Sequence, residues 1–279
     1  MTALHSNAFE KMAKIIKDFR VEVNKNEILR LLGHISKHGN IKKRSKELVE
    51  EMISFSCDLI KPEGIFVIRE SRELPEECFF NAEKVAFCIC TIGKSLEKQV
   101  ERLTNQGELA RAVTLDAIGS VAAESAAERI NQVIADEAKK KKLYGNTRFS
   151  PGYGGWKLEA QRFIFDLLPT EKIGVRLNRS FMMIPRKSVS FAINLSRNPF
   201  KDKGSTPCEI CGLKKCRFKK DAKRSATLSG AVEKVKLGEC HSESAEGETK
   251  NLYLNQRDSS VATLPQNDRM GFFQHGLLG

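Results

Sequence analysis

Apolar residues recur at intervals of three and four along the first sixty residues, which is the spacing of one face of an α-helix. The pattern breaks at Gly39 and Asn40, two poor helix formers in a row. We therefore expect a helical lead-in over residues 1–60. Its apolar positions are Phe9, Met12, Ile15, Ile16, Phe19, Ile28, Leu31, Leu32, Leu48, Met52 and Phe55.

The texture changes at Lys61, where short, β-branched apolar runs appear between turn or charged residues. Such runs are typical of strands. They alternate irregularly with helical stretches, and the chain shows neither a regular β-α repeat nor a phosphate-binding glycine loop. Residues 61–200 are therefore predicted to form a mixed α+β domain around an antiparallel sheet, not a dinucleotide-binding fold. The predicted strands are 65–68, 85–90, 173–177, 181–184 and 188–195.

Residues 108–138 carry the longest helical stripe, and residues 158–168 a shorter amphipathic one. Small side chains dominate the middle of the long helix, so another backbone or a ligand could approach it closely. Glu124 lies on or beside the apolar stripe and is a candidate buried carboxylate. The alternative is an ordinary glutamate at the boundary of the helix.

Beyond about Ser225 no helical or strand period is sustained, and Ser, Gly, Glu, Asn and Gln dominate. Such a composition predicts a disordered tail over residues 226–279.

The composition, with 41% hydrophobic residues in 279, is sufficient for a core. The sequence shows no apolar run of membrane-spanning length and no export signal, so we expect a soluble, cytoplasmic protein without a membrane partner. The net charge of +12 is concentrated at residues 139–142 and 214–224. Because no aromatics are interleaved with these basic residues, a solvated or protein-docking surface is favoured over nucleic-acid binding.

Cys208, Cys211 and Cys216 form a tight cluster within a basic segment, residues 201–225. Neighbouring thiolates persist together most easily around a cation, so zinc or an iron-sulfur cluster is the hypothesis; three free thiols are the alternative. Without an export signal, disulfides are not expected. Cys88 and Cys90 alternate along a predicted strand and should face the same side as a buried pair.

A loop of unusual composition begins at Arg148 and continues to Gln161. Pro151 fixes φ, and three nearby glycines permit conformations and close approaches that a Cβ forbids. Arg148 offers a planar fork for a carboxylate, while Tyr153 and Trp156 offer flat faces with polar tips. The set suits an amphipathic anionic or zwitterionic ligand. The alternative is an Ω-loop whose aromatics only pin it to the core.

The run Arg148-Phe-Ser-Pro-Gly-Tyr153 resembles the R-x-x-P-G-Y loop of the S-adenosylmethionine-binding activation domain of cobalamin-dependent methionine synthase. Glu171-Lys-Ile-Gly174, Ser180-Phe-Met-Met-Ile-Pro185 and Lys187-Ser-Val-Ser190 follow in that family's order. Stand-alone activation proteins are the most similar, because they share the C-x2-C-x4-C motif. The resemblance implies the activation-domain fold, with a twisted, largely antiparallel sheet and long helices.

The resemblance also implies a function, an accessory role in reductive methylation. In that family, a flavodoxin-like donor reduces inert cob(II)alamin on a cobalamin-binding methionine synthase subunit to cob(I)alamin. S-adenosylmethionine then methylates the cob(I)alamin to methylcobalamin. The chain would thus be a component of a methyltransferase, with no catalytic residue of its own. An interpretation as a reductive activator of another corrinoid methyltransferase, using a cysteine-ligated metal, stays open. So does a basic, non-catalytic adaptor.

Site roles follow from the same resemblance. Arg148 would pair with the carboxylate of S-adenosylmethionine, and Glu124 with its ammonium or sulfonium, since a family glutamate stands in a similar Ala-Glu-x-x-Ala setting. Main chain at Phe149 and Ser150 would bind adenine or ribose. Gly152 would also belong to the S-adenosylmethionine-binding residues, and Tyr153 would line the pocket near the methyl. The sequence departs from the family at Gly155 and Lys157, where an acidic residue and a proline are expected.

Overall fold

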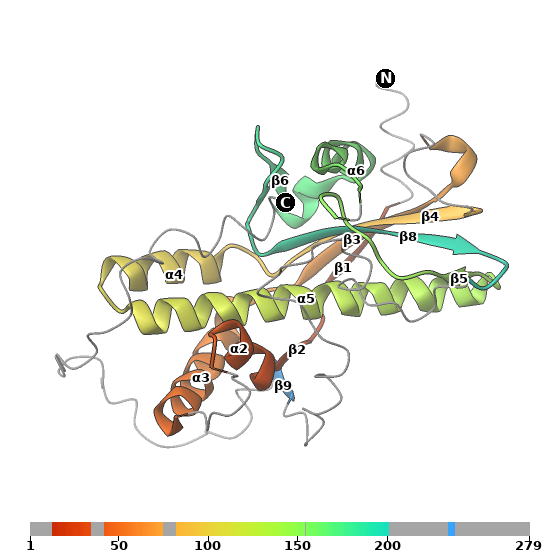
Figure 1. Cartoon of the computed structure of the whole chain (residues 1–279). Coiled ribbons are helices and arrows are strands. Elements are labelled where there is room, and N and C mark those ends of the chain that lie inside the picture. Colours follow the sequence, from red (N-terminus) through yellow and green to blue (C-terminus); the bar gives the residue numbers. More distant parts are fainter. Residues whose placement is uncertain (1–12, 35–41, 75–81, 154, 201–233, 238–279) are drawn as a thin grey trace. The chain divides into compact units, whose positions relative to one another are not determined.

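The computed structural model describes residues 13–34, 42–74, 82–153, 155–200 and 234–237. Its main sheet has five strands in the order β1-β3-β4-β8-β5, and every neighbouring pair is antiparallel. Figure 1 shows helix α5 running along one face of this sheet. The strands are β1 (Lys14–Lys17), β3 (Glu63–Glu70), β4 (Lys84–Thr91), β5 (Tyr144–Gly145) and β8 (Ser188–Ser196).

The central strands are continuously apolar because both faces of the sheet are covered. Alternate residues of β4 enter different cores, since successive side chains of a strand point to opposite faces. Cys88 and Cys90 belong to the core on the α5 side, and Phe87 and Ile89 to the core on the opposite side. The prediction that the two cysteines share one side is therefore confirmed.

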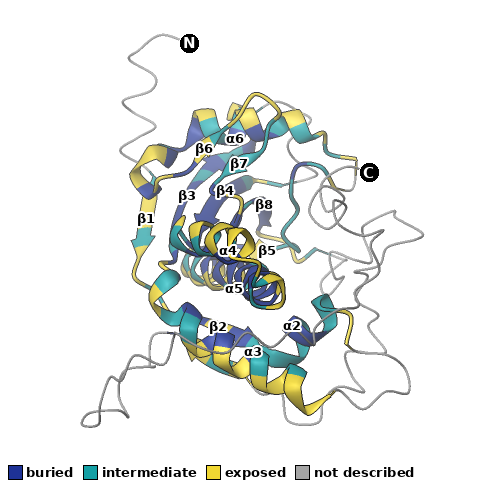
Figure 2. Cartoon of the chain, turned by 90° about the vertical axis from the view of Figure 1, so that its left-hand side faces the viewer, coloured by how far each residue is buried: buried dark blue, intermediate teal, exposed yellow. Residues whose placement is uncertain are grey.

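Helix α5 (Leu109–Lys140) lies between the main sheet and a second layer (Figure 2). That layer contains α2 (Lys25–Leu31), α3 (Lys43–Ser56) and a two-stranded sheet of β2 (Val21–Asn24) and β9 (Lys234–Leu237). Helix α5 is therefore covered on both sides, which explains its many buried small residues.

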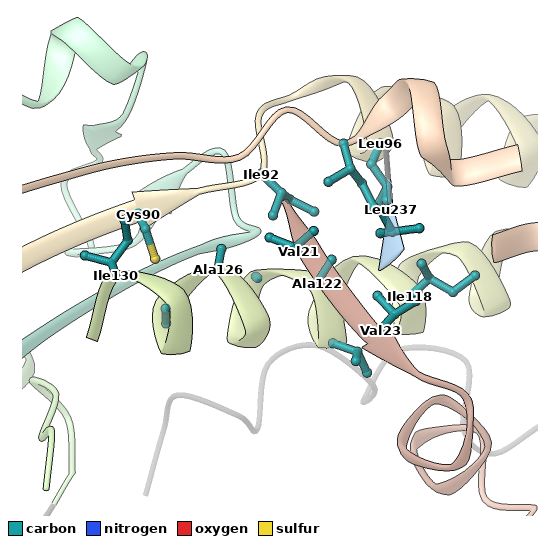
Figure 3. Close-up of a cluster of buried hydrophobic side chains, with 14 of the residues drawn as sticks. Val21, Val23, Cys90, Ile92, Leu96, Ile118, Ala122, Ala126, Ile130 and Leu237 are labelled. Atoms are coloured by element: carbon teal, nitrogen blue, oxygen red, sulfur yellow. The ribbon is translucent and has the colours of Figure 1, made fainter. Parts of the chain in front are cut away.

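The contact between these layers is apolar. Figure 3 shows Val21 and Val23 of β2 and Leu237 of β9 gathered around Ile118 and Ala122 of α5. Helix α4 (Ser95–Asn105) packs beside α5 and contributes Leu96, which is fully buried. The second layer thus shares one core with the α5 side of the main sheet.

Short elements cover the other face of the sheet. Ile164 and Leu167 of α6 and Ile173 of η5 pack there against the apolar residues of β3 and β4. The elements on this side are η4 (Leu158–Ala160), α6 (Gln161–Leu167), η5 (Thr170–Ile173), β6 (Arg176–Leu177) and β7 (Met183–Ile184). Two further 3₁₀ turns, η1 (Cys57–Leu59) and η2 (Ser71–Glu73), flank β3 in the chain.

The predicted α+β class is confirmed: an antiparallel sheet is combined with long helices, and the fold is not a Rossmann fold. The strands predicted at 65–68, 85–90 and 188–195 are present, as is the helix predicted at 108–138. The helix predicted at 158–168 begins as the 3₁₀ turn η4 and continues as α6. The segment predicted as a strand at 173–177 begins instead as the 3₁₀ turn η5.

The helical prediction for the lead-in is wrong at residues 14–17 and 21–24, which form β1 and β2. Val21 and Val23 are buried while Glu22 between them is exposed, a two-residue period that pairs with β9. Tertiary pairing overrides the helical spacing here. Helix α2 begins at Lys25, and Asn24 is its N-cap. The side chain of Asn24 accepts hydrogen bonds from the main-chain N–H groups of Asn26 and Glu27 at 2.9 and 3.3 Å.

Strand β9 lies within the stretch for which the sequence predicts no regular structure. Its four residues pair in register with β2, and Leu237 is only 4% exposed. The fold therefore uses residues beyond 225, and any variant for binding studies needs them. Within the residues described by the structure, no helix is long and apolar enough to span a membrane.

Candidate functional site

The loop after Arg148 is built from two successive turns. The N–H of Tyr153 donates to the carbonyl of Ser150 at 3.2 Å, across Pro151 and Gly152 with φ +90°. Proline followed by a glycine with positive φ is the signature of a type II turn. The N–H of Trp156 then donates to the carbonyl of Tyr153 at 3.0 Å. The backbone at Gly152 therefore requires glycine.

Main-chain pairing attaches this loop to the main sheet. The N–H of Phe149 donates to the carbonyl of Ala192 in β8 at 3.0 Å, and the N–H of Ala192 donates to the carbonyl of Phe149 at 2.8 Å. The rings of Phe149 and Trp156 lie 5.2 Å apart and pack against the core on the α6 side. These two aromatics pin the loop, as the Ω-loop alternative expects. Tyr153 does not, because it is 43% exposed.

Arg148 points to the opposite face of the sheet, toward α5. Its guanidinium carbon lies 5.6 Å from the ring centroid of Phe191 in β8, within the range of a cation–π contact. Its Nη2 donates to Oε1 of Glu124, and its Nε lies 3.8 Å from Oε2 of Glu128. Two carboxylates of α5 thus face one arginine held by β8.

Helical periodicity explains how α5 presents this pair. Glu124 and Glu128 are four residues apart, so they lie on one face one turn from each other. The side chain of Glu124 is 50% exposed, whereas that of Arg148 is 12% exposed. The prediction of a buried carboxylate at Glu124 is therefore wrong. The alternative, a glutamate at the boundary between the buried and exposed faces of the helix, agrees with its exposure. Its pairing with Arg148 nevertheless places it at the loop.

The structure brings some predicted ligand groups together and restricts others. Arg148 and Glu124, 24 residues apart in sequence, are in contact. The N–H of Phe149 is engaged by β8, which leaves only a second lone pair on its carbonyl for a ligand. The N–H of Gly152 likewise donates to the carbonyl of Trp156 at 2.7 Å. The side chains of Arg148, Glu124 and Tyr153 therefore carry most of the recognition that remains.

Sequence reasoning missed Glu128 and Phe191. The spacing from Glu124 to Glu128 is one turn and could have suggested the former. Nothing in the sequence links Phe191 to Arg148, because their contact depends on how the loop pairs with β8. Gln161, at the end of the loop motif, is structural. Its Nε2 donates to the carbonyl of Phe181 at 3.0 Å, and its Oε1 accepts from Ser190.

The buried thiol of Cys88 lies on the same face of the sheet as Phe191, its partner across the strands. Burial raises the pKa of Cys88 well above its ordinary value, and a hydrogen bond with Cys90 adds to this. The positive charge of Arg148 lowers the pKa of Cys88, acting against these two effects. Cys88 is therefore a neutral thiol at physiological pH.

Other cysteine predictions have different outcomes. Cys57 takes part in a disulfide bond, which corrects the expectation of reduced cysteines. Cys208, Cys211 and Cys216 lie outside the described residues. Among the residues that are described, no group of three or more His, Cys, Asp or Glu side chains could hold a metal ion.

Comparison with known proteins agrees with the geometry. A family model described as "Vitamin B12 dependent methionine synthase, activation domain" matches residues 78–198, which include the loop and Glu124. A crystal structure described as the MetH reactivation domain bound to AdoHcy has a TM-score of 0.50 and 13% identity, and the match covers 70% of this chain and 79% of that one. No curated protein sequence matches. The resemblance expected from the motifs is confirmed over the matched residues.

Proposed function

We propose, from the premise that residues 78–198 are an activation domain of the vitamin B12-dependent methionine synthase type, that this chain binds S-adenosylmethionine and presents its methyl group to a cobalamin held by a partner. The chain would act as an accessory subunit in the reductive methylation that reactivates the synthase.

The observation that carries the proposal is the contact between Arg148 and Glu124 at the open edge of α5. A ligand with only a carboxylate would leave Glu124 without its cation, and a ligand with only an ammonium would leave Arg148 without its anion. An α-amino carboxylate supplies both. The planar guanidinium suits a bidentate carboxylate, and Glu124 can accept from the ammonium. The ion pair between the two residues is then exchanged for two ion pairs with the ligand.

The remainder of the ligand would lie along the loop. The carbonyls of Phe149 and Ser150 would accept hydrogen bonds from adenine or ribose. Gly152 would hold the turn in its required conformation, and the exposed ring of Tyr153 would cover the sulfonium end. When bound, S-adenosylmethionine supplies an electrophilic methyl group. The chain needs no acid or base for this chemistry, because its work is orientation and the exclusion of water.

The cobalamin would come from a separate subunit, since the sequence contains no D-x-H-x-x-G cobalamin-binding signature. A flavodoxin-like protein would supply the electron. This assignment rests on the family match and on the sequence resemblance, and it predicts that the Arg148 loop faces the partner.

The test is calorimetric titration of the full chain with S-adenosylmethionine. Saturable binding is expected, and Arg148→Ala should weaken it by about 1.5–3 kcal/mol, the range for a hydrogen bond to a charged group. Arg111→Ala is the matched control. Arg111, itself in α5, also pairs with two carboxylates, Glu51 of α3 at 2.9 Å and Glu108 just before α5 at 3.0 Å. Absence of binding in the wild type, or equal losses in both variants, would overturn the proposal.

A further inference from the structure

A second charged contact to α5 lies just before β8, whereas the Arg148 loop pairs with the middle of that strand at Ala192. Lys187 immediately precedes β8, and its Nζ lies 2.8 Å from Oδ2 of Asp116 and 2.8 Å from Oγ of Ser120. The side chains of Lys187 and Asp116 are only 9% and 5% exposed. Lys187 and Asp116 therefore form a buried ion pair.

The main chain of Lys187 is fixed independently of its side chain. Its N–H donates to Oε1 of Glu97 in α4 at 2.6 Å. Its carbonyl accepts from the N–H of Ile92, just beyond β4, at 3.2 Å. The ammonium thus reaches α5 from a backbone that is anchored to α4 and to the end of β4.

The absence of a side chain at Gly119 leaves space on α5 for Lys187. A Cβ on Gly119 would lie 2.6 Å from Cδ2 of Leu96 and 3.3 Å from Cε of Lys187. The glycine therefore lets both side chains cross α5 closely, at a position where glycine weakens a helix by about 1 kcal/mol relative to alanine. Asp116, Gly119 and Ser120 together form the receiving surface for Lys187.

The buried ion pair and the loop share one face of α5. Asp116, Ser120, Glu124 and Glu128 follow one another at four-residue steps, so they form one row along the helix. Asp116 and Glu124 are separated by about 12 Å along the axis. Lys187 engages the beginning of this row and Arg148 its end, and β8 connects them through Ser188 to Ala192.

Apolar packing alone fixes the position of α5 along β8 weakly. The buried positions of α5 include many small residues, among them Ala122 and Ala126, both 0% exposed. Small side chains make shallow ridges, and deep ridges are what set the register of packed helices. A buried ion pair adds little net stability over apolar residues of similar volume. Its directional contacts can instead select one register.

We propose that Lys187, Asp116 and Ser120 form a positioning site that sets the register of α5 against β8 and thereby places Glu124 opposite Arg148. The inference rests on the proposed function for its ligand, while the geometry that it explains belongs to the free protein. Lys187 is a positioning residue, because it acts on the ligand site through α5 and touches no ligand.

The first test reads the geometry without ligand. In the full chain labelled with ¹⁵N-arginine, the Nε–H signal of Arg148 is assigned by its disappearance in Arg148→Ala. Lys187→Met, which retains most of the apolar stem, should shift or broaden this signal. Arg111→Met, which removes an ion pair between α5 and Glu51 of α3, should leave it in place. An unchanged Arg148 signal in folded Lys187→Met would overturn the proposal.

The second test reads binding. Lys187→Met should lower the affinity for S-adenosylmethionine about tenfold, and Arg111→Met less than twofold. In a Glu124→Ala background the Lys187 substitution should add less than twofold, since its effect passes through the placement of Glu124. Equal losses in both backgrounds would mean a merely structural role. If the wild type does not bind S-adenosylmethionine, the proposed function fails while the ¹⁵N-arginine experiment still decides the inference. If Lys187→Met does not fold, Asp116→Leu/Lys187→Met removes both charges and takes its place in both tests.

Discussion

Two ion pairs join the same row of α5 to segments that adjoin β8, yet their side chains differ in exposure to water. Lys187 and Asp116 have side chains 9% and 5% exposed, and the ammonium has a second partner in Ser120. In the pair of Arg148 and Glu124, the arginine is 12% exposed and the glutamate 50%. The first pair is closed, and the second is open on its helix side.

This difference separates a fixed contact from an exchangeable one. Removing one partner of a buried pair leaves an uncompensated charge in a medium of low polarity. Removing one partner of a half-open pair lets water solvate the other. A ligand that replaces Glu124 as the partner of Arg148 therefore needs little free energy to do so. The buried pair of Lys187 and Asp116 resists exchange, which suits a part of the molecule that must not move.

The largest effect should come from breaking the closed pair. Asp116→Asn leaves the ammonium of Lys187 buried without its anion, and we expect a loss of about 3–5 kcal/mol in the free energy of unfolding. Denaturant unfolding measures this loss. Glu47→Gln, which breaks the exposed pair with Lys43, is the control and should change stability by less than about 0.5 kcal/mol. A similar small change in Asp116→Asn would show that the closed pair is not desolvated.

A somewhat smaller effect is expected where the lysine crosses α5. Gly119→Ala gains about 1 kcal/mol of helix propensity. Its Cβ, however, would meet Leu96 at 2.6 Å and Lys187 at 3.3 Å. Such overpacking typically costs about 1–3 kcal/mol, so the net result should be a loss of up to about 2 kcal/mol. Thermal and denaturant unfolding measure it.

Leu96→Val supplies the check on this prediction, because valine lacks the Cδ atoms that the new methyl would meet. The loss caused by Gly119→Ala should be smaller in the Leu96→Val background than in the wild type. An increase in stability from Gly119→Ala alone would mean that Leu96 and Lys187 do not need the space at Gly119.

These contacts also show where sequence reasoning reaches its limit. The strands 65–68, 85–90 and 188–195 were predictable because a continuous apolar run is a local signal. The loop at Arg148 was predictable because proline and glycine reveal a turn directly. The pairing of β2 with β9 was not, since the partner strand lies more than two hundred residues along the chain. The contact between Lys187 and Asp116 spans 71 residues. No local pattern of apolar and polar residues in the sequence indicates it.

The pH dependence of stability tests whether water reaches Cys88, the buried thiol near Arg148. Burial raises the folded-state pKa of Cys88 above its ordinary value of 9.0. The stabilisation is therefore complete below the unfolded pKa and is lost as pH rises toward the raised folded value, because only the unfolded thiol ionises there. The wild type should lose up to about 1.4 kcal/mol per pH unit above pH 9 relative to Cys88→Ala. Parallel pH profiles for the two proteins would mean that water reaches the thiol, and hence the region between Arg148 and the sheet.

The smallest effect on stability should come from the open pair. Glu124→Gln removes a charge that is half exposed, and we expect a loss of less than about 1 kcal/mol in the free energy of unfolding. The same substitution should weaken S-adenosylmethionine binding about tenfold, since a hydrogen bond to a charged group contributes about 1.5–3 kcal/mol and glutamine retains part of it. Unfolding and calorimetry on one preparation measure both quantities. A large loss of stability with unchanged binding would assign Glu124 to the architecture, and the distinction between the two ion pairs would then be wrong.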